Sequence, residues 1–474
     1  MKIVLWLAVC TPAAGAFFLP LFDKISEKFK NITALVLVFS SFVFSALLLP
    51  PALAGDPVSI HIALPLGLSF GFQADSLAVF MAMISSFVGS IIVFYSFTYI
   101  NHYKHKGEYY LMVVLFLGAM MGLVYSTNLI FLYVFWEIAA ICCWRLIGFY
   151  REKEFIFRAN KAFLITAAGA LMMLLGFLLI YQETGTFDMT RLRGTHISNT
   201  AVLLILAGIL SKSATLPFHT WLPDAGVAPS PVTSLLHAAV LVKIGVYAWA
   251  RLFLVTFAIN DIWHTVVPVI AAVSSLVAAA GAIREYDIKR IIAYSTVSQI
   301  GFILLGLSTG SVMGAAGGLL YILMHSIAKG GLFLCAGVVE HNAGTKDVRK
   351  LGGLWKTMPV TAVSFLLCAF SVMGIPPFGG FFSKFMVIGG AVQSGKPWIA
   401  AVFAAGAVLT FIYMLRAFTL VFMGEMKTQA REGSRSMVAS VAALAALSLA
   451  GGLFIFFPSM FVQNIVSQMG GFVQ

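Results

Sequence analysis

A small number of ionisable residues lie inside long apolar stretches of this sequence, and these residues are the best placed to do chemistry. Glu137 is in the middle of LIFLYVFWEIAAICCW, Lys212 precedes a proline-rich segment, and Lys243 lies in LLHAAVLVKIGVYAW. An ionisable side chain at the depth of a bilayer costs at least about 2.5–3.5 kcal/mol. We therefore expect these side chains to face the inside of a helix bundle, where polar partners or water compensate the charge.

Two histidines and two more lysines extend this set. His325 and Lys329 are four residues apart in YILMHSIAKGGLFL and therefore share one face of a helix. His237 precedes Lys243 by six residues, so these two side chains leave the helix in different directions. A lone buried histidine such as His237 can also simply hydrogen-bond to a neighbouring helix. Lys384 follows a second proline-rich segment, and a lysine near the end of a span can instead extend to the membrane interface.

These residue types suit proton transfer. Burial favours the neutral form of a lysine, whereas a nearby carboxylate favours the charged form, so the charge depends on how close the partner lies. Arginine would not serve, because its guanidinium does not release a proton. Histidine adds a group that takes and gives a proton near neutral pH. The sequence therefore predicts a proton pathway through Glu137, Lys212, His237, Lys243, His325, Lys329 and Lys384.

Composition indicates the class of protein that must hold these residues. Of the 474 residues, 60% are hydrophobic and only 10% are charged, and the mean hydropathy is +0.97. A soluble domain carries about 25% charged residues. The sequence therefore predicts an all-α polytopic membrane protein.

Motifs for cofactors are missing. The five cysteines lie in apolar runs without CxxC spacing, which is typical of small buried hydrophobic residues. No GxxxxGK[ST], GxGxxG after a strand, HExxH or iron–sulfur cysteine cluster occurs. We expect no cofactor, metal or redox centre on this chain. The net charge of +12 lies in short loops, which favours a topological signal over a nucleic-acid partner.

Apolar runs of about 18 residues or more predict about 14 transmembrane helices. The N-terminal MKIVLWLAVCTPAAGAFF resembles a signal peptide, and we interpret it as the first of them. The boundary within 109–150 is the weakest, because only YSTN separates two runs. The expected spans are 3–21, 31–53, 75–100, 109–127, 129–150, 161–182, 199–217, 232–256, 263–283, 289–308, 313–339, 357–392, 397–424 and 437–461.

Basic residues test this segmentation. Loops after odd-numbered spans hold many of them: Lys24, Lys28, Lys30, Lys104, Lys106, Arg151, Lys153, Arg158, Lys161, Arg284, Lys289, Arg290, Lys346, Arg349, Lys350, Lys356, Lys427, Arg431 and Arg435. The other side holds Lys2, Arg191, Arg193 and Lys396. Cytoplasmic loops are enriched in Lys and Arg. The asymmetry favours an even number of spans with both termini on the non-cytoplasmic side.

Two spans are interrupted by prolines. LPFHTWLP contains Pro217 and Pro223, and GIPPFGGFF contains Pro376 and Pro377. Broken helices at membrane depth survive only inside protein or beside a hydrated cavity, and two breaks five spans apart are typical of two inverted five-helix repeats. The alternative is a pair of ordinary proline kinks. The expected divisions are an N-terminal three-helix segment (1–108), two half-channels (109–256 and 257–424) and a C-terminal helix (425–474).

Three charged residues have more ordinary interpretations. Arg145 lies eight residues after Glu137 on roughly the same helix face, where it is either a structural counter-ion or a side chain that reaches the interface. Asp75 and Asp224 lie at span ends, where capping a helix is the default role.

At these residues the chain resembles the antiporter-like subunits of respiratory complex I, which are shared with multisubunit cation/proton antiporters and membrane-bound hydrogenases. The matching stretches are FWEIAAICCWRLIGF (135–149), SKSATLPFHTWLPDAGVAPSPVTSLLHAAVLVKIGVY (211–247), DIKRIIAYSTVSQIGF (287–302), HSIAKGGLFLCAG (325–337) and GIPPFGGFFSK (374–384). The resemblance implies 14 transmembrane helices, two half-channels and a hydrated line of charges across the membrane midplane.

The resemblance also implies roles for single residues. Glu137 and Lys212 match a glutamate–lysine pair whose separation drives a proton onward, and Lys243 matches a bridging lysine. His325 and Lys329 match a central pair, and Lys384 matches the terminal charge of the second half. Arg145 stands where the family usually has an uncharged residue, so it could tune the Glu137 switch.

The resemblance leads to a hypothesis and an alternative. The hypothesis is a proton-translocating subunit of a larger complex in the energy-transducing inner or cytoplasmic membrane, driven by a partner redox module or an ion gradient. Its expected partners are other membrane subunits, further antiporter-like subunits among them, together with lipids and a peripheral arm with iron–sulfur clusters. The alternative is a Na⁺/H⁺-exchanging subunit without redox chemistry. A solute transporter would need more polar, non-titratable residues at the breaks.

Overall fold

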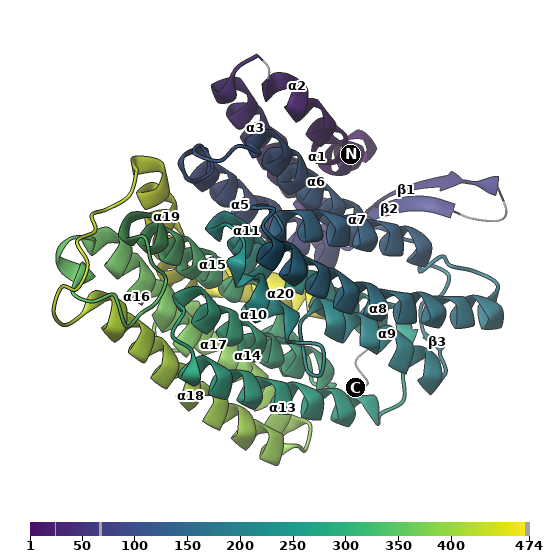
Figure 1. Cartoon of the computed structure of the whole chain (residues 1–474). Coiled ribbons are helices and arrows are strands. Elements are labelled where there is room, and N and C mark those ends of the chain that lie inside the picture. The colour runs from purple at the N-terminus through teal and green to yellow at the C-terminus, as the bar shows by residue number, and fades with distance from the viewer. Residues whose placement is uncertain (24, 66–68, 470–474) are drawn as a thin grey trace.

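The computed structural model describes residues 1–23, 25–65 and 69–469, and helices dominate it (Figure 1). The α-helices up to the first proline-rich segment are α1 (Lys2–Gly15), α2 (Leu19–Asp23), α3 (Glu27–Leu47), α4 (Leu49–Leu53), α5 (Ser76–Tyr99), α6 (Lys106–Tyr125), α7 (Leu129–Ile147), α8 (Lys153–Thr184) and α9 (Asn199–Lys212). Those that follow are α10 (Trp221–Asp224), α11 (Ser230–Ser234), α12 (Leu241–Trp249), α13 (Trp263–Arg284), α14 (Ile288–Ser308), α15 (Val312–Ala343), α16 (Pro359–Met373), α17 (Gly379–Gln393), α18 (Pro397–Phe422), α19 (Arg435–Leu453) and α20 (Phe456–Gln468).

Shorter elements connect these helices. The 3-10 and π-helical segments are η1 (Ala16–Phe18), η3 (Ala225–Val227), η4 (Leu235–Ala239), η5 (Ala250–Thr256) and η6 (Leu354–Lys356). The strands are β1 (Val58–Ala63), β2 (Ser69–Ala74), β3 (Thr195–His196) and β4 (Phe257–Ala258).

Length and apolar composition confirm an all-α polytopic membrane protein. Within the described residues, 12 helices are long and apolar enough to cross a membrane. Two shorter apolar helices, Asn199–Lys212 and Pro359–Met373, begin the two interrupted spans. The exact number of fourteen, the inverted repeats and the four predicted divisions of the chain stay predictions.

The weakest predicted boundary, between the fourth and fifth spans, is present. Helix α6 ends at Tyr125 and α7 begins at Leu129, so only three residues connect them. Asn128 starts α7, because its side-chain oxygen accepts a hydrogen bond from the backbone N–H of Ile130 at 2.9 Å. A side chain that satisfies one of the free N–H groups at a helix start allows two long helices to meet at a sharp turn.

Loops that follow even-numbered spans gather at one end of the bundle, which we call the hairpin end. There β1 and β2 form an antiparallel hairpin that projects to the right in Figure 1. Isolated bridges join Phe72 to Ser126 and Asn128 to Asp188, and β3 pairs with β4 in parallel. Segments far apart in the sequence therefore meet at this end, as the predicted alternation of spans requires.

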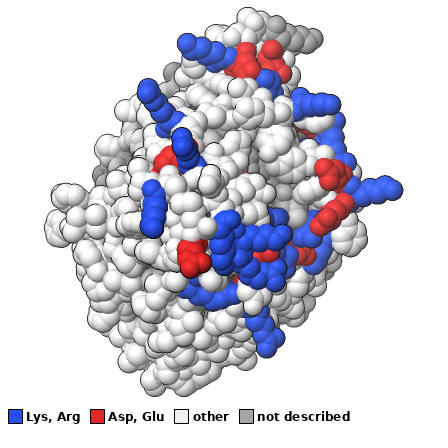
Figure 2. Space-filling model, turned by 60° about the vertical axis from the view of Figure 1, so that its left-hand side comes forward, with Lys and Arg blue, Asp and Glu red and all other residues white. Residues whose placement is uncertain are grey.

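The opposite end carries most of the basic residues, and we call it the basic end. Figure 2 shows Lys and Arg side chains gathered over it, interspersed with Asp and Glu, with uncharged flanks. Asp224 accepts hydrogen bonds from Lys161 at 2.7 Å and from Arg290 at 2.8 Å. The expectation that Asp224 caps a helix was wrong, because this carboxylate instead ties α10 to α8 and α14. Burial raises the pKa of Asp224, but its two cationic partners outweigh burial and hold the pKa below its usual value.

Helix α15 forms the centre of the core. It packs against α14, α16, α17 and α19. In an apolar stretch of 18 residues of this helix, 94% of the residues are buried. The irregular helical segment from α11 to η5 is buried to the same extent, whereas α8 and α18 are much more exposed. His325 and Lys329 on α15 therefore lie in the protein interior and not at the lipid surface.

Both predicted breaks are present, but one of the four prolines does not cause them. Pro217 lies between α9 and α10, and Pro376 and Pro377 lie between α16 and α17. Pro223 is inside the short helix α10. A proline is tolerated there because N–H groups in the first turn have no partner within the helix.

The second break is held by glycines that admit no side chain. A Cβ at Gly452 in α19 would lie 1.9 Å from the carbonyl oxygen of Pro377, and one at Gly380 would lie 1.8 Å from that of Ser371. Backbone therefore packs directly on backbone at this point.

We expect Gly452→Ala to destabilise the protein by about 1–3 kcal/mol, which is the usual cost of overpacking. Thermal unfolding of the purified assembly would report it as a lower melting temperature. Gly406→Ala in α18 is the matched control, because its Cβ would meet only ordinary contacts, the nearest at 3.4 Å. Equal melting temperatures for the two variants would contradict this account.

Candidate functional site

Lys212 is the last residue of α9 and is fully buried. Its ammonium donates to the carbonyl oxygen of Trp136 on α7 at 3.2 Å and lies 5.2 Å from the centre of the Trp136 ring. Trp136 directly precedes Glu137, so the predicted partners are brought to neighbouring positions. The described residues show no ion pair between Lys212 and Glu137, and one Glu137 carboxylate oxygen is buried without a hydrogen-bond partner.

Lys243 and His325 are in direct contact in the centre of the bundle. The Lys243 Nζ lies 2.6 Å from Nδ1 of His325, and it also donates to the backbone carbonyl of His237 at 3.2 Å. The ring of His237 packs on Phe333 at 4.3 Å between centroids, and neither of its nitrogens has a hydrogen-bond partner in the described structure. The sequence did not predict the contact between Lys243 and His325, which are 82 positions apart.

The helix that carries Lys243 is irregular, and this irregularity creates the acceptor for the lysine. Regular α12 lies between the π-helical segments η4 and η5, and the backbone at Val240 leaves the helical region with φ −127° and ψ −72°. Short π segments inside α-helices are frequent at functional sites. Gly245 packs α12 against α9, because a Cβ there would lie 2.7 Å from the Ile209 carbonyl.

Lys329 is linked to a buried polar network that the sequence did not predict. Its ammonium donates to Ser295 Oγ at 2.5 Å and to the Ile292 carbonyl at 3.2 Å. Tyr413 donates to the same Ser295 hydroxyl at 3.0 Å, and Gln299 donates to Tyr413 at 3.1 Å. This network joins α14, α15 and α18.

Tyr321 connects that network to the remaining members of the site. Its hydroxyl donates to Gln299 Oε1 at 2.6 Å. The Tyr321 ring lies 5.9 Å from the ring of His325, and Lys384 lies 5.8 Å from its centre. The spacing of Tyr321, His325 and Lys329 at intervals of four was the signal that could have revealed this residue in the sequence.

Lys384 is buried and does not extend to the membrane interface. Its Nζ donates to the Val372 carbonyl at 2.7 Å and lies 4.5 Å from the centre of the Phe302 ring. The residue four positions after Val372 is Pro376, which has no N–H to bond that carbonyl. The second break therefore leaves an acceptor free, and Lys384 takes it.

All four lysines thus share one arrangement: each donates to a backbone carbonyl, and in the described structure none of them pairs with a carboxylate. A buried ammonium is tolerable only where hydrogen bonds replace its lost hydration. Because the acceptors are neutral, each site also accommodates the neutral amine. The geometry therefore suits groups that change charge during function.

Arg145 lies outside this set. Its Nε donates to Glu108 on α6, and Arg151 donates to the other carboxylate oxygen of the same residue. The three side chains lie together at the basic end and are about one-third exposed. Arg145 is thus a counter-ion of Glu108, and no contact in the structure links it to Glu137.

The sequence matches two family models over these elements. The family described as NADH:quinone oxidoreductase/Mrp antiporter matches residues 126–410, which hold Glu137, the four central lysines and both histidines of the site. The family described as NADH-ubiquinone oxidoreductase (complex I), chain 5 N-terminus, matches residues 61–110. The chain belongs to the NADH:quinone oxidoreductase/Mrp antiporter family. This confirms the resemblance found in the sequence.

Curated relatives of this family member include Na(+)/H(+) antiporter subunit A1 from Staphylococcus haemolyticus (strain JCSC1435) and from Staphylococcus aureus (strain MRSA252). Each is 32% identical over 505 aligned positions, which cover 98% of this chain. The chain spans 62% of the length of those relatives.

Two solved structures share the fold of this family member. They are the structure of the Mrp complex from Dietzia sp. DQ12-45-1b and that of the membrane-bound sulfane sulfur reductase, an archaeal respiratory membrane complex. Each aligns with a TM-score of 0.91 at 24% identity, and covers 99% of this chain and 98% of its own.

We expect Arg145→Gln and Glu108→Gln to be coupled in a double-mutant cycle by about 0.2–1 kcal/mol, as is usual for exposed ion pairs. Arg145→Gln and Glu137→Gln should be additive, because the structure shows no contact between them. Thermal unfolding of the assembled protein measures both cycles. Coupling of Arg145 to Glu137 instead would restore a tuning role for Arg145.

Proposed function

We propose that this chain is a proton-translocating, antiporter-like subunit of a larger membrane complex. One observation carries the proposal: four lysines and His325 are buried in the middle of the fold, Lys212 next to the segment with Glu137, Lys243 against His325, and Lys384 against Tyr321. Intramembrane ionisable groups are costly and typically mark ion or proton routes. The cost would serve no purpose in a protein that only anchors its partners.

The first half of the proposed route ends at the contact between Lys243 and His325. A proton on the lysine needs to move only across their 2.6 Å hydrogen bond to reach Nδ1 of the histidine. The free Nε2 of His325 can then release a proton on the other side of the ring. The histidine therefore acts as a relay between the helix α12 and its own helix α15.

The second half uses the polar network around Lys329. The hydrogen bonds run from Lys329 through Ser295, Tyr413 and Gln299 to Tyr321, and Lys384 lies against the Tyr321 ring. The hydroxyl groups of Ser295, Tyr413 and Tyr321 both donate and accept and can pass a proton without changing their own charge, whereas the Gln299 amide holds the two tyrosine hydroxyls in position and does not itself relay a proton. The network supplies such groups where lysines alone are too widely spaced.

In the proposed cycle, Lys212 is the point of control. Its ammonium donates to the carbonyl of Trp136, and the next residue in the chain is Glu137. One carboxylate oxygen of Glu137 has no hydrogen-bond partner in the described structure. Formation of the Glu137–Lys212 pair would favour the charged lysine, and its separation would favour release of the proton towards Lys243.

A partner subunit is expected at the outer face of α7. Glu137 is only half-buried, and the flanking residues Val134 and Ile141 are 41% and 51% exposed. A carboxylate at bilayer depth is unfavourable against lipid. We propose that another membrane subunit of the complex covers this face, and further antiporter-like subunits are the natural candidates.

The remaining proposals concern the setting of the complex. The basic end would face the cytoplasm, with both termini on the other side of an inner or cytoplasmic membrane. Lipids would surround the exposed helices, and the chain would carry no cofactor of its own. Any redox chemistry, including a peripheral arm with iron–sulfur clusters, would belong to partner subunits.

The transported ions have a second candidate. The curated relatives named above are called Na(+)/H(+) antiporter subunits, which favours Na⁺/H⁺ exchange by a complex without redox chemistry. Proton movement that requires a Na⁺ gradient in vesicles of the whole complex would support exchange, and proton movement driven by a redox substrate would support pumping.

We predict that Lys212→Ala or Glu137→Ala abolishes proton movement by the complex while assembly persists, because either change removes one half of the switch. Fluorescence of a pH-sensitive dye in proteoliposomes measures the transport, and co-purification of the other subunits measures assembly. The matched control is Lys30→Ala, which removes another buried lysine that pairs with Asp23 far from the route. Wild-type transport in an assembled Lys212→Ala complex would refute the proposal.

A photoreactive amino acid at Val134 should cross-link to another protein subunit in the native complex. The same amino acid at Val277 on α13, which is 45% exposed, tests whether exposed membrane-facing positions generally give such products. Mass spectrometry of the products would identify the partner. Cross-links from Val134 to lipid alone would contradict a subunit interface at α7.

A further inference from the structure

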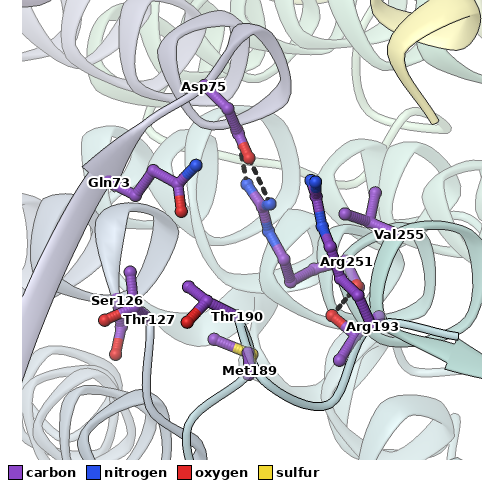
Figure 3. A pocket seen from close by; sticks show the side chains of 10 residues that line it. Gln73, Asp75, Ser126, Thr127, Met189, Thr190, Arg193, Arg251 and Val255 are labelled. Carbon is purple, nitrogen blue, oxygen red and sulfur yellow. Dashed lines mark hydrogen bonds and ion pairs between the residues drawn. The ribbon is translucent and has the colours of Figure 1, made fainter. Parts of the chain in front are cut away.

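A polar pocket lies at the hairpin end, and Figure 3 shows the side chains that line it. The free space within it is small, about 20 Å³, which is room for about one water molecule. Every lining residue comes from a connection after an even-numbered span or from the adjoining helix ends. The polar members are Gln73, Asp75, Ser126, Thr127, Thr190, Arg193, Arg251 and Thr256.

A buried ion pair lies against the pocket. The two terminal guanidinium nitrogens of Arg251 donate to the carboxylate of Asp75, at 2.5 and 2.7 Å, and the side chains of Arg251 and Asp75 are only 9% and 15% exposed. The sequence assigned Asp75 a capping role, and the structure confirms it, since Asp75 accepts from the Ala78 N–H at 2.9 Å. The pairing with Arg251, however, goes beyond what a helix cap needs.

The same arginine lies on the helical segment that carries Lys243, a member of the proposed proton route. Lys243, Tyr247 and Arg251 follow one another at intervals of four and therefore lie along one face of the helix, about 6 Å apart per step. The Nε of Arg251 donates to the Tyr247 hydroxyl at 2.9 Å, and that hydroxyl donates to the Val124 carbonyl at 2.6 Å. Val124 lies near the end of α6, just before the connection that provides Ser126 and Thr127.

The pocket also holds an unsatisfied polar group. Thr127 is 3% exposed, and its hydroxyl oxygen has no hydrogen-bond partner in the described structure, although it lines the pocket. Arg251 itself lies in the π-helical segment η5. A π segment allows local rearrangement of a helix, so the arginine is on the part of this helix best able to move.

We propose that Asp75 and Arg251 form the gate of the proton route at the hairpin end, with the polar pocket as its vestibule. When the gate is closed, Arg251 donates to both Asp75 and Tyr247, so the carboxylate is not available to accept a proton. When Arg251 moves away from Asp75, the freed carboxylate takes a proton that the Tyr247 hydroxyl passes on as it receives one from Lys243 through intervening water, since Lys243 and Tyr247 are about one helical turn apart. Asp75 then gives that proton to water in the pocket, and the sequence can run in reverse.

This inference rests on the proposed function, but two of its tests do not require driven transport by the complex. The variant is the double replacement Asp75→Asn with Arg251→Gln, in the whole complex. Asparagine caps a helix as well as aspartate does, and both charges are removed together, so no buried charge is left unpaired. A purely structural pair would therefore tolerate the change.

The decisive measurement is the passive proton leak of proteoliposomes after a potassium diffusion potential is imposed with valinomycin. We expect the double variant to assemble, to pass protons at least about tenfold more slowly, and to lose coupled transport, because asparagine at position 75 cannot accept the proton that Tyr247 passes on. An assembled double variant with wild-type leak and wild-type transport would overturn the gate.

Two further measurements keep the proposal testable if the double variant does not assemble. Tyr247→Phe, which removes only the hydroxyl, should slow transport by about 10²-fold. Tyr109→Phe is the control, since this buried hydroxyl bonds Ser96 at the other end. Equal transport by both variants would count against the route.

The last measurement locates the vestibule. Thr127→Cys, in a background without the native cysteines, should react with a membrane-impermeant thiol reagent added from the hairpin side and not from the basic side. Absence of labelling, or labelling from the basic side, would overturn the proposal. Labelling and passive leak do not depend on driven transport. They can therefore contradict the gate while Lys212→Ala still abolishes transport, and they can support the gate while Lys212→Ala leaves transport unchanged.

Discussion

A lysine ammonium in the interior of a membrane protein has lost its water and must find other hydrogen-bond acceptors. In this chain the four central lysines meet that requirement with backbone carbonyls. A carbonyl accepts equally well whether or not a charge is nearby to compensate, so the lysine is not locked into its charged form as it would be by a permanent carboxylate partner. The rest of the architecture depends on supplying those acceptors at the right places.

The helix interruptions supply two of them. Pro376 has no N–H, so the Val372 carbonyl is free for Lys384. Near Val240 the helix changes its winding, and Lys243 takes the carbonyl of His237. What looks like a defect in a membrane helix is therefore a way to hold a titratable group. Glycines make the arrangement possible, because at the second break backbone packs on backbone.

The two ends of the bundle use charge differently from the middle. There, carboxylates and cations are paired directly, as in Asp224 with Lys161 and Arg290 or Asp75 with Arg251. Such pairs hold fixed charges, which suits anchoring and gating. In the middle, the lysines bond backbone carbonyls and none of them pairs with a carboxylate among the described residues. The ionisable residues of this apolar sequence therefore form two groups, ion pairs at the ends of the bundle and lysines bonded to carbonyls in its middle.

The sequence by itself determined the membrane class, the grouping of loops at two ends, the two breaks and the set of titratable residues, because each follows from local composition and from the cost of charge in hydrocarbon. Only the tertiary structure decided what those residues touch. Lys212 meets Trp136 across 76 positions and Arg251 meets Asp75 across 176, and no local pattern encodes such contacts. The polar side chains of Ser295, Gln299 and Tyr413 were invisible for the same reason: hydroxyl and amide groups are common in membrane helices, and only the packing of α14 against α15 and α18 lines them up beside Lys329.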